Sequence, residues 1–189
     1  AKIEAALERV RSRSMAMHKS EELEQVILVV SEQLQQLQFK FDNVSFGFDT
    51  EQMGLNFSLA SPQLSKPFLI KVPYIDNPAF NRPLQARKKG VYFNIDVLSR
   101  EENLQFLQHM FDYSDLRHIP AESKNFLFGT PGFARSQSLM KNTILTVGNY
   151  APAPYSQEQN AIIKRFGNAF EQAYVRFLDL QKAEAQARE

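Results

Sequence analysis

Apolar residues at both ends of the chain follow a spacing that a helix can use and a strand cannot. Near the start, the steps between these positions are four, three, four and three residues, with one polar member: Ile3, Leu7, Val10, Ser14 and Met17. Near the end, the same steps recur over a longer run: Ile163, Phe166, Phe170, Ala173, Phe177, Leu180, Glu184 and Ala187. Such steps place side chains along one side of a helix, as in a coiled coil. The sequence therefore predicts a helix at each end.

The second of these helices is expected to begin at Ser156, which forms a capping-box pattern with Gln159. From there to Glu189 it would be about 50 Å long at 1.5 Å per residue, more than a compact core of this size needs. We expect its inner part to pack on the domain and its outer part to project. The alternative is a frayed polar terminus. A projecting apolar seam favours a homodimer through both terminal helices, with this interface: Ile3, Leu7, Val10, Met17, Phe170, Phe177 and Leu180.

In the middle of the chain the period of the apolar residues changes to two. Val44, Phe46 and Phe48 alternate with small or polar residues, and residues 55–61 repeat the pattern after a short connection. This predicts an antiparallel pair of strands. Further strands are expected in four segments: PFLIKVPY, VYFNID, NFLFGT and SLMKNTILTVGN.

Helices are expected between these strands. Ser20 is a candidate cap for a helix with an apolar face at 23–37, Asn77 precedes Pro78 at a second helix start, and Ser99 precedes a third. Helices segregated around an antiparallel sheet make an α+β domain. We expect a connector helix at 1–19, a globular domain at 20–155, and a helix at 156–189 that packs on the domain and continues as a coiled-coil connector.

The composition excludes several classes of function. The chain has no cysteine, so disulfides, thiolate metal sites and cysteine nucleophiles are excluded within it. A net charge of +1 gives no general attraction to nucleic acid or to an anionic membrane. No apolar run reaches the roughly 18 residues that span a bilayer. These observations favour a cytoplasmic setting, with no contact to nucleic acid or membrane.

Catalytic and metal-binding motifs are also missing. The chain contains no glycine-rich phosphate loop, no H-E-x-x-H and no G-x-S-x-G. His109 and His118 lie nine residues apart, across the expected end of a helix, which does not suit metal ligation. We expect His109 on a helix surface and His118 in a loop, with no metal site and no cofactor. An enzyme is the weaker hypothesis.

A binding cavity is the more plausible site. Ligand pockets are mostly apolar with a few placed polar groups, and the candidate residues fit that description: Phe46, Asn56, Ser58, Tyr74, Phe80, Tyr92, Phe126 and Phe128. The alternative is that these aromatic residues fill the core and that Asn56 and Ser58 face water.

The two ends of the chain resemble a known family. The segments IEAALERVRSRSMAMHKSEEL and FEQAYVRFLDLQKAEAQARE resemble the connectors that flank GAF-like sensory domains in large bacterial signalling proteins, namely sensor histidine kinases and related regulators. The segments YIDNPAF and KKGVYFNIDVLSREE resemble the middle of such domains. The resemblance implies a GAF/PAS-like fold with a central antiparallel sheet and a potential pocket. It also implies signal sensing or relay, often as a parallel dimer.

Two specialised chemistries of this family do not carry over. The cysteine of bilin-binding members is absent, and the pattern of cyclic-nucleotide-binding members is not found. His18 is expected to be structural rather than a phospho-acceptor, because no kinase hairpin follows it. We therefore expect a non-catalytic sensory module that binds a small ligand or relays a conformational state in two-component signal transduction. The alternative is a ligand-free structural spacer.

Overall fold

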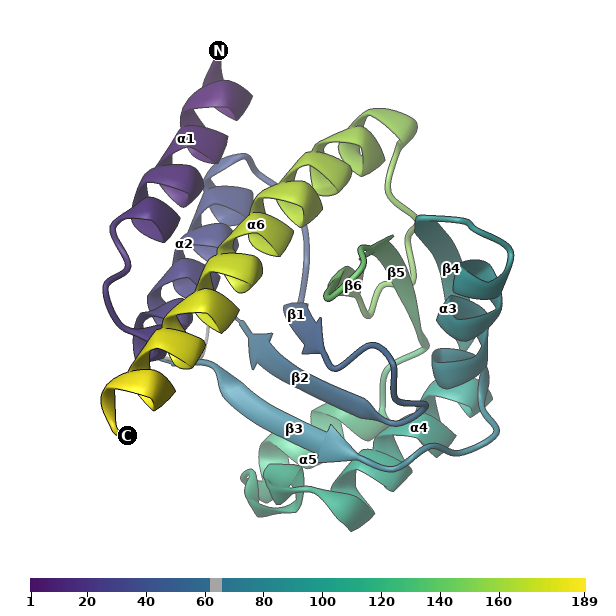
Figure 1. Cartoon of the computed structure of the whole chain (residues 1–189). Coiled ribbons are helices and arrows are strands. Elements are labelled where there is room, and N and C mark those ends of the chain that lie inside the picture. The colour runs from purple at the N-terminus through teal and green to yellow at the C-terminus, as the bar shows by residue number, and fades with distance from the viewer. Residues whose placement is uncertain (62–65) are drawn as a thin grey trace.

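The computed structural model describes residues 1–61 and 66–189, which form an α+β domain built on an open antiparallel sheet (Figure 1). Its helices are α1 (Lys2–Met15), α2 (Leu23–Gln36), α3 (Pro78–Lys88), α4 (Arg100–Tyr113), α5 (Ala121–Phe128) and α6 (Gln157–Ala187). Its strands are β1 (Asn43–Phe48), β2 (Leu55–Ala60), β3 (Phe68–Val72), β4 (Phe93–Ser99), β5 (Gly132–Leu139) and β6 (Ile144–Asn149). Short 3₁₀ turns occupy Ser20–Glu22 and Asp115–His118.

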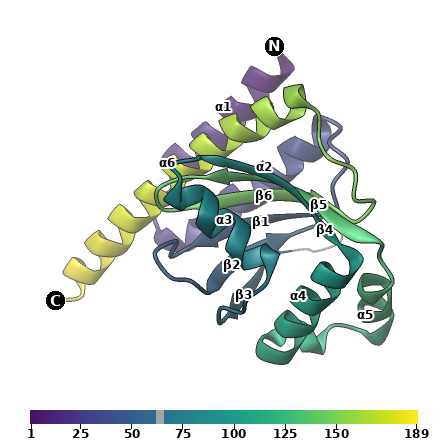
Figure 2. The same ribbon diagram turned by 90° about the vertical axis from the view of Figure 1, so that its right-hand side faces the viewer.

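The strands lie in the order β3-β2-β1-β6-β5-β4, and all neighbours are antiparallel. Helices α2 and α6 cover one face of the sheet with α1 packed against both of them, and α3, α4 and α5 lie on the other face (Figure 2). The α+β class and the central antiparallel sheet predicted from the sequence are confirmed. Among the described residues, no helix combines the length and apolar composition needed to cross a bilayer.

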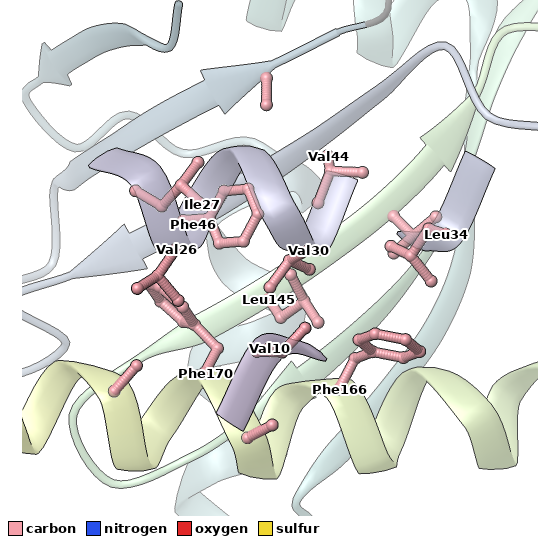
Figure 3. Packing of buried hydrophobic residues seen from close by; sticks show 14 of the residues in the cluster. Val10, Val26, Ile27, Val30, Leu34, Val44, Phe46, Leu145, Phe166 and Phe170 are labelled. Atoms are coloured by element: carbon pink, nitrogen blue, oxygen red, sulfur yellow. The ribbon is translucent and has the colours of Figure 1, made fainter. Parts of the chain in front are cut away.

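The face covered by α2 and α6 is tightly packed. In β1, Val44 and Phe46 point toward these helices, and the Phe46 ring meets the Phe170 ring edge-on with centroids 4.8 Å apart (Figure 3). Phe166 from α6 and Leu145 from β6 complete the same cluster. All five side chains are buried, and the most exposed of them, Leu145, is only 1% exposed. Burial of each such side chain contributes about 1.5–3 kcal/mol to folding.

The terminal helices run side by side in the same direction. Arg165 pairs with Glu4 near their starts, and Arg176 donates to the Met17 carbonyl further along, at 2.7 Å. At the far end, Glu184 of α6 accepts hydrogen bonds from Ser20. The two termini of the chain therefore lie at opposite ends of this layer (Figure 1).

This packing uses the apolar seams inside the chain. Four of the expected interface residues are fully buried in the chain's own core: Leu7, Val10, Met17 and Phe170. The other three are partly buried against it: Ile3, Phe177 and Leu180. The four buried residues have no surface left for a second subunit, because α2 and the sheet complete the contacts that a partner helix would have made. A homodimer stays a prediction, and of the expected interface residues Ile3, Phe177 and Leu180 keep exposed surface that a second chain could contact.

Two element assignments from the sequence are wrong. The segment NFLFGT belongs to helix α5 and its end rather than to a strand, because Pro120 starts a helix that Gly129 ends. The strand before β6 is instead Gly132–Leu139, whose polar residues hid it from a search for apolar alternation. Ser20 does not cap α2 either; it lies in the preceding 3₁₀ turn and donates its hydroxyl to Glu184, at 2.6 Å.

The connection between α1 and α2 is held by one carboxylate. Glu22 accepts the backbone N–H of His18 at 2.6 Å and that of Lys19 at 2.8 Å, and it pairs with Arg13 at 3.0 Å. The exposed ring of His18 takes no part in these contacts. The bonds from His18, then Lys19, then Arg13 lower the pKa of Glu22 from 4.5 to about 2.

We predict that Glu22 makes the stability of the domain sensitive to acid. A carboxylate whose pKa is lowered on folding adds stability above its unfolded pKa, and this contribution is lost as the pH falls through the folded pKa. The difference in urea midpoint between the wild type and Glu22→Gln should be present at neutral pH and shrink between pH values of about 4.5 and 2. Glu21→Gln is the control, because Glu21 is exposed. A difference that stays constant over that range would contradict the assignment.

A second prediction concerns the contact between α6 and β5. Alanine normally stabilises a helix interior by about 1 kcal/mol relative to glycine. At Gly167, however, a β-carbon would collide with the side chain of Ser138. We expect Gly167→Ala to lower the free energy of unfolding by about 1–3 kcal/mol in urea denaturation. Adding Ser138→Gly should make the double variant less destabilised than the sum of the single variants. An increase in stability for Gly167→Ala alone would show that the contact is loose.

Candidate functional site

A cavity of about 710 Å³ lies on the sheet face opposite α6, between the sheet and helices α3, α4 and α5. Strand alternation explains the space. Where Val44 and Phe46 of β1 point toward α6, the intervening Ser45 and Gly47 lie on the cavity face, and neighbouring β6 contributes Thr146. Gly47 has no side chain and those of Ser45 and Thr146 are small, so they fill little of the volume that the helices enclose.

The wall formed by the helices is mostly apolar. It includes Phe80, Pro83 and Leu84 from α3, Phe106, Leu107 and Met110 from α4, and Phe126 and Leu127 from α5. Strands β2 and β3 add further apolar side chains: Leu55, Phe57, Leu59, Phe68 and Ile70. The cavity thus offers a large apolar surface, against which a few polar groups stand out.

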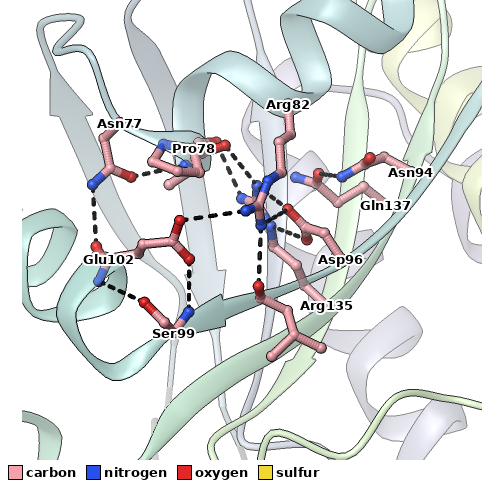
Figure 4. Close-up of polar contacts among 11 residues, drawn as sticks. Asn77, Pro78, Arg82, Asn94, Asp96, Ser99, Glu102, Arg135 and Gln137 are labelled. Atoms are coloured by element: carbon pink, nitrogen blue, oxygen red, sulfur yellow. Dashed lines mark hydrogen bonds and ion pairs between the residues drawn. The ribbon is translucent and has the colours of Figure 1, made fainter.

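Arg135 on β5 is the most buried of the charged residues in the cavity wall. Its guanidinium forms two hydrogen bonds with the carboxylate of Asp96 on β4, at 2.7 and 3.0 Å, and also donates to the carbonyls of Pro78 and Ala79 (Figure 4). The Arg135 and Asp96 side chains are 5% and 8% exposed. This pairing neutralises the charge and uses the donors of the arginine, so Arg135 has a structural role.

The carboxylate of Asp96 also anchors α3, and through Arg82 it is linked to α4. Arg82 of α3 pairs with Asp96 at 3.2 Å and with Glu102 of α4 at 3.3 Å (Figure 4). Glu102 also completes the capping box with Ser99 that the sequence predicted. The network therefore fixes the starts of both helices over the sheet.

Asn103 on α4 is one of the two cavity-lining residues, among those the structure describes, that have a buried side-chain nitrogen without a hydrogen-bond partner. It lines the cavity, it is 2% exposed, and its side-chain nitrogen has no hydrogen-bond partner among the described residues. A buried donor without a partner costs about 1–3 kcal/mol. Asn77, which is 1% exposed, is fully used by contrast: it caps α3 and donates to Glu102 and Gln105.

Arg87, in the last turn of α3, is the second such group. Its guanidinium lines the cavity and donates to the Thr143 carbonyl at 3.2 Å, while its Nε has no partner among the described residues. Burial lowers the pKa of this guanidinium, and the charge of Glu171 partly opposes that effect. Unlike Arg135, it forms no ion pair with a described carboxylate.

A further polar cluster lies where β1 and β6 approach α5. The Tyr150 hydroxyl accepts a hydrogen bond from Asn43 at 3.1 Å, and Asp42 accepts the Tyr150 backbone N–H at 2.7 Å. Burial, and then the negative charge of Asp42, raise the pKa of Tyr150. All three residues line the cavity. The phenol therefore stays neutral and has a proton to donate.

Three of the eight ligand-binding residues expected from the sequence line this cavity: Asn56, Phe80 and Phe126. Phe80 is buried in the wall, whereas Phe126 is 62% exposed at the edge. Asn56 donates to Asp49 at 2.7 Å, beside the turn between β1 and β2.

The other five lie outside the cavity. Phe46 and Ser58 form a cross-strand pair on the opposite sheet face, toward α6. Tyr74 packs behind Phe80 and donates to Asn81, Tyr92 is 74% exposed before β4, and Phe128 packs on Phe111. Alternation shows which residues share a face of a strand, but not which helices will cover that face.

Sequence patterns did not indicate the polar groups of the cavity. Arg87 lies in the last turn of its helix, where a cation is favourable without any ligand, and no pattern singles out Asn103. A charged residue within a buried strand, as in GFARSQSL, was the one available signal. The expectation that His109 lies on a helix surface is wrong: it is 7% exposed and bonds the Pro73 carbonyl through Nε2, at 2.7 Å. His118 lies exposed in a 3₁₀ turn.

Comparison with solved structures agrees with this architecture. A fragment of a methyl-accepting chemotaxis protein, residues 122 to 287, superposes with a TM-score of 0.52 at 13% identity, covering 92% of this chain and 98% of that fragment. Free methionine-R-sulfoxide reductase from Neisseria meningitidis, solved in complex with its substrate, superposes with a TM-score of 0.50 at 14% identity, covering 96% and 91%. The fold is GAF-like. At these identities the likeness concerns the GAF-like fold alone. No protein-family model and no curated protein sequence matches the chain.

We predict opposite effects for the two buried asparagines of the GAF-like domain. Asn103→Leu removes an unsatisfied donor, so it should raise the free energy of unfolding of the ligand-free protein by about 1 kcal/mol. Asn77→Leu removes a satisfied cap and should lower it by about 1–2 kcal/mol. Urea denaturation of both variants checks this. Equal losses for the two would show that Asn103 has a partner in solution.

Proposed function

We propose that this GAF-like domain is a sensory module that binds a small molecule between the sheet and helices α3–α5. The observation that carries the proposal is the unsatisfied amide of Asn103 in the wall of a cavity of about 710 Å³. Native interiors are close-packed and rarely leave polar groups without partners. A ligand with a hydrogen-bond acceptor would fill the space and satisfy the donor.

The size and lining of the cavity support binding. Pockets for small ligands have volumes of about 300–1,000 Å³ and are mainly apolar, with a few polar groups that orient the ligand. Here Arg87, Asn103 and Tyr150 are the polar groups with donors to spare. They lie on α3, on α4 and directly after β6, so together they can select a ligand by the positions of its hydrogen-bond acceptors.

The neighbours in fold are compatible with this role. One is part of a chemotaxis protein, and the other was solved with its substrate bound. We propose a bacterial, cytoplasmic signalling protein, such as a histidine kinase of a two-component system, as the setting of this domain. The resemblance of the terminal segments to connectors of such proteins supports that setting.

We further propose that the domain binds its ligand without converting it. One neighbour in fold is a sulfoxide reductase. Reduction of a sulfoxide by a protein's own side chains takes thiols, and this chain has no cysteine. None of the described residues lining the cavity is a histidine, the residue most often used as a general acid or base. The alternative, a ligand-free structural spacer, would be supported by aromatic side chains packed across this face, and the cavity weighs against it.

Binding can be tested by blocking the cavity. Ser45→Leu adds three carbon atoms from the middle of the sheet, whereas Ser12→Leu adds the same side chain on the exposed surface of α1. We expect saturation-transfer NMR with a library of small aromatic and aliphatic fragments to detect binders of the wild type. The same fragments should bind Ser12→Leu and should lose binding to Ser45→Leu.

Two results would contradict the proposal. Either no fragment binds the wild type, or the fragments bind Ser45→Leu as well as they bind Ser12→Leu. Circular dichroism of both variants serves as the control for folding. Because Ser45→Leu fills existing space, we expect its thermal midpoint to stay at or above that of the wild type.

A further inference from the structure

Arg87 in the cavity wall is a cation that forms no ion pair with any carboxylate that the structure describes. Arg87 presents five N–H donors in a planar fork, and among the described residues it makes one hydrogen bond, to the Thr143 carbonyl. Its Nε is buried and has no partner within residues 1–61 and 66–189. Arg135 and Arg82, the other two arginines packed at α3, are both paired with Asp96. The fold thus supplies carboxylates for two of these three cations.

A buried or half-buried charge is costly unless it is paired. Glu171 is the acidic group that acts on Arg87 electrostatically, but its oxygens are occupied elsewhere: they accept hydrogen bonds from Asn142 and from the Thr143 hydroxyl. The remaining donors of Arg87 therefore lack an anion. Around them the cavity wall is apolar, with Pro83, Leu84 and Ile144 lining the same volume.

We propose that the ligand of the cavity is a small carboxylate with an apolar body, and that its carboxylate binds the guanidinium of Arg87. This inference rests on the proposed function and specifies the chemistry of the same site. A planar carboxylate matches the fork of an arginine with two parallel hydrogen bonds. The apolar wall accounts for the rest of the molecule. Asn103 would donate to a second acceptor on the ligand.

The position of Arg87 also provides a route to the terminal helix. Thr143 lies in the turn between β5 and β6. Its carbonyl accepts from Arg87, while its hydroxyl donates to Glu171 of α6 at 2.8 Å. Asn142 adds bonds to the same carboxylate, at 2.8 Å from its side chain and at 3.2 Å from its backbone. A carboxylate bound by the remaining donors of Arg87 pulls on the guanidinium that also donates to the Thr143 carbonyl, so we expect binding to shift the turn that holds α6.

The test uses matched pairs of probes on the whole chain. 3-Phenylpropionate is compared with 3-phenylpropanamide, and octanoate with octanamide, because each pair keeps the apolar body and removes the charge. Binding is measured by NMR titration of the wild type, Arg87→Met and Lys88→Met. Lys88 is the matched control because it is an exposed cation in the same helical turn.

We expect at least one carboxylate to bind the wild type and Lys88→Met about tenfold or more tightly than its amide, since a hydrogen bond between two charged groups is stronger than one to a neutral amide. Arg87→Met should lose this preference, and Arg87→Lys, which keeps the charge, should retain part of it. Hydrogen exchange at residues 140–143 and near Glu171 should change when the carboxylate binds the wild type, and stay unchanged with the amide.

The outcomes separate the two proposals. Amides that bind as tightly as carboxylates, or a carboxylate preference that survives in Arg87→Met, would overturn the inference about Arg87 and leave the binding function standing. If neither carboxylates nor any neutral fragment binds the wild type, the proposed function fails and the inference falls with it.

Discussion

The buried ion pair between Arg135 and Asp96 is the contact on which the second layer of this domain depends. It joins β5 to edge strand β4, and the same guanidinium holds two carbonyls in the first turn of α3. Arg82 then ties α3 to Asp96 and to the start of α4. Breaking a buried pair by removing one partner costs about 3–5 kcal/mol, because a charge is left uncompensated. The network thus keeps two helices above the sheet without filling the space beneath them with side chains.

The two faces of the sheet differ because of the side chains that alternate along its central strands. Phe46 and Val44 of β1 pack against Phe170 and its neighbours on one face, which becomes a dense core. Ser45 and Gly47 of the same strand lie on the other face, where the cavity forms. One strand therefore supports both the rigid attachment of α6 and the space for a ligand. The turn between β5 and β6 connects the two, since Thr143 contacts Arg87 on one side and Glu171 on the other.

Features that depend on local chemistry were predictable from the sequence. The caps at Ser156, Asn77 and Ser99 are present as expected, because a cap needs only residues a few positions apart. The α+β class and the antiparallel sheet follow from the same local periods, and the resemblance to GAF-like domains indicated the fold. Features that depend on tertiary partners were not predictable. The apolar seam of α6 packs on α1, α2 and the sheet of its own chain, and Phe46 lies on the face away from the cavity. Asn103 and Arg87 stand out only because the folded chain leaves their donors unpaired, which no sequence pattern records.

The central claim is that the space between the sheet and α3–α5 is a ligand site. A crystal structure of the protein soaked with its tightest-binding fragment tests this most directly. The account predicts density for the fragment in the cavity, with an acceptor atom within hydrogen-bond distance of Arg87 or Asn103. Side chains of α3 and α4 collapsed into that space, or a fragment bound elsewhere on the surface with the cavity closed, would contradict it.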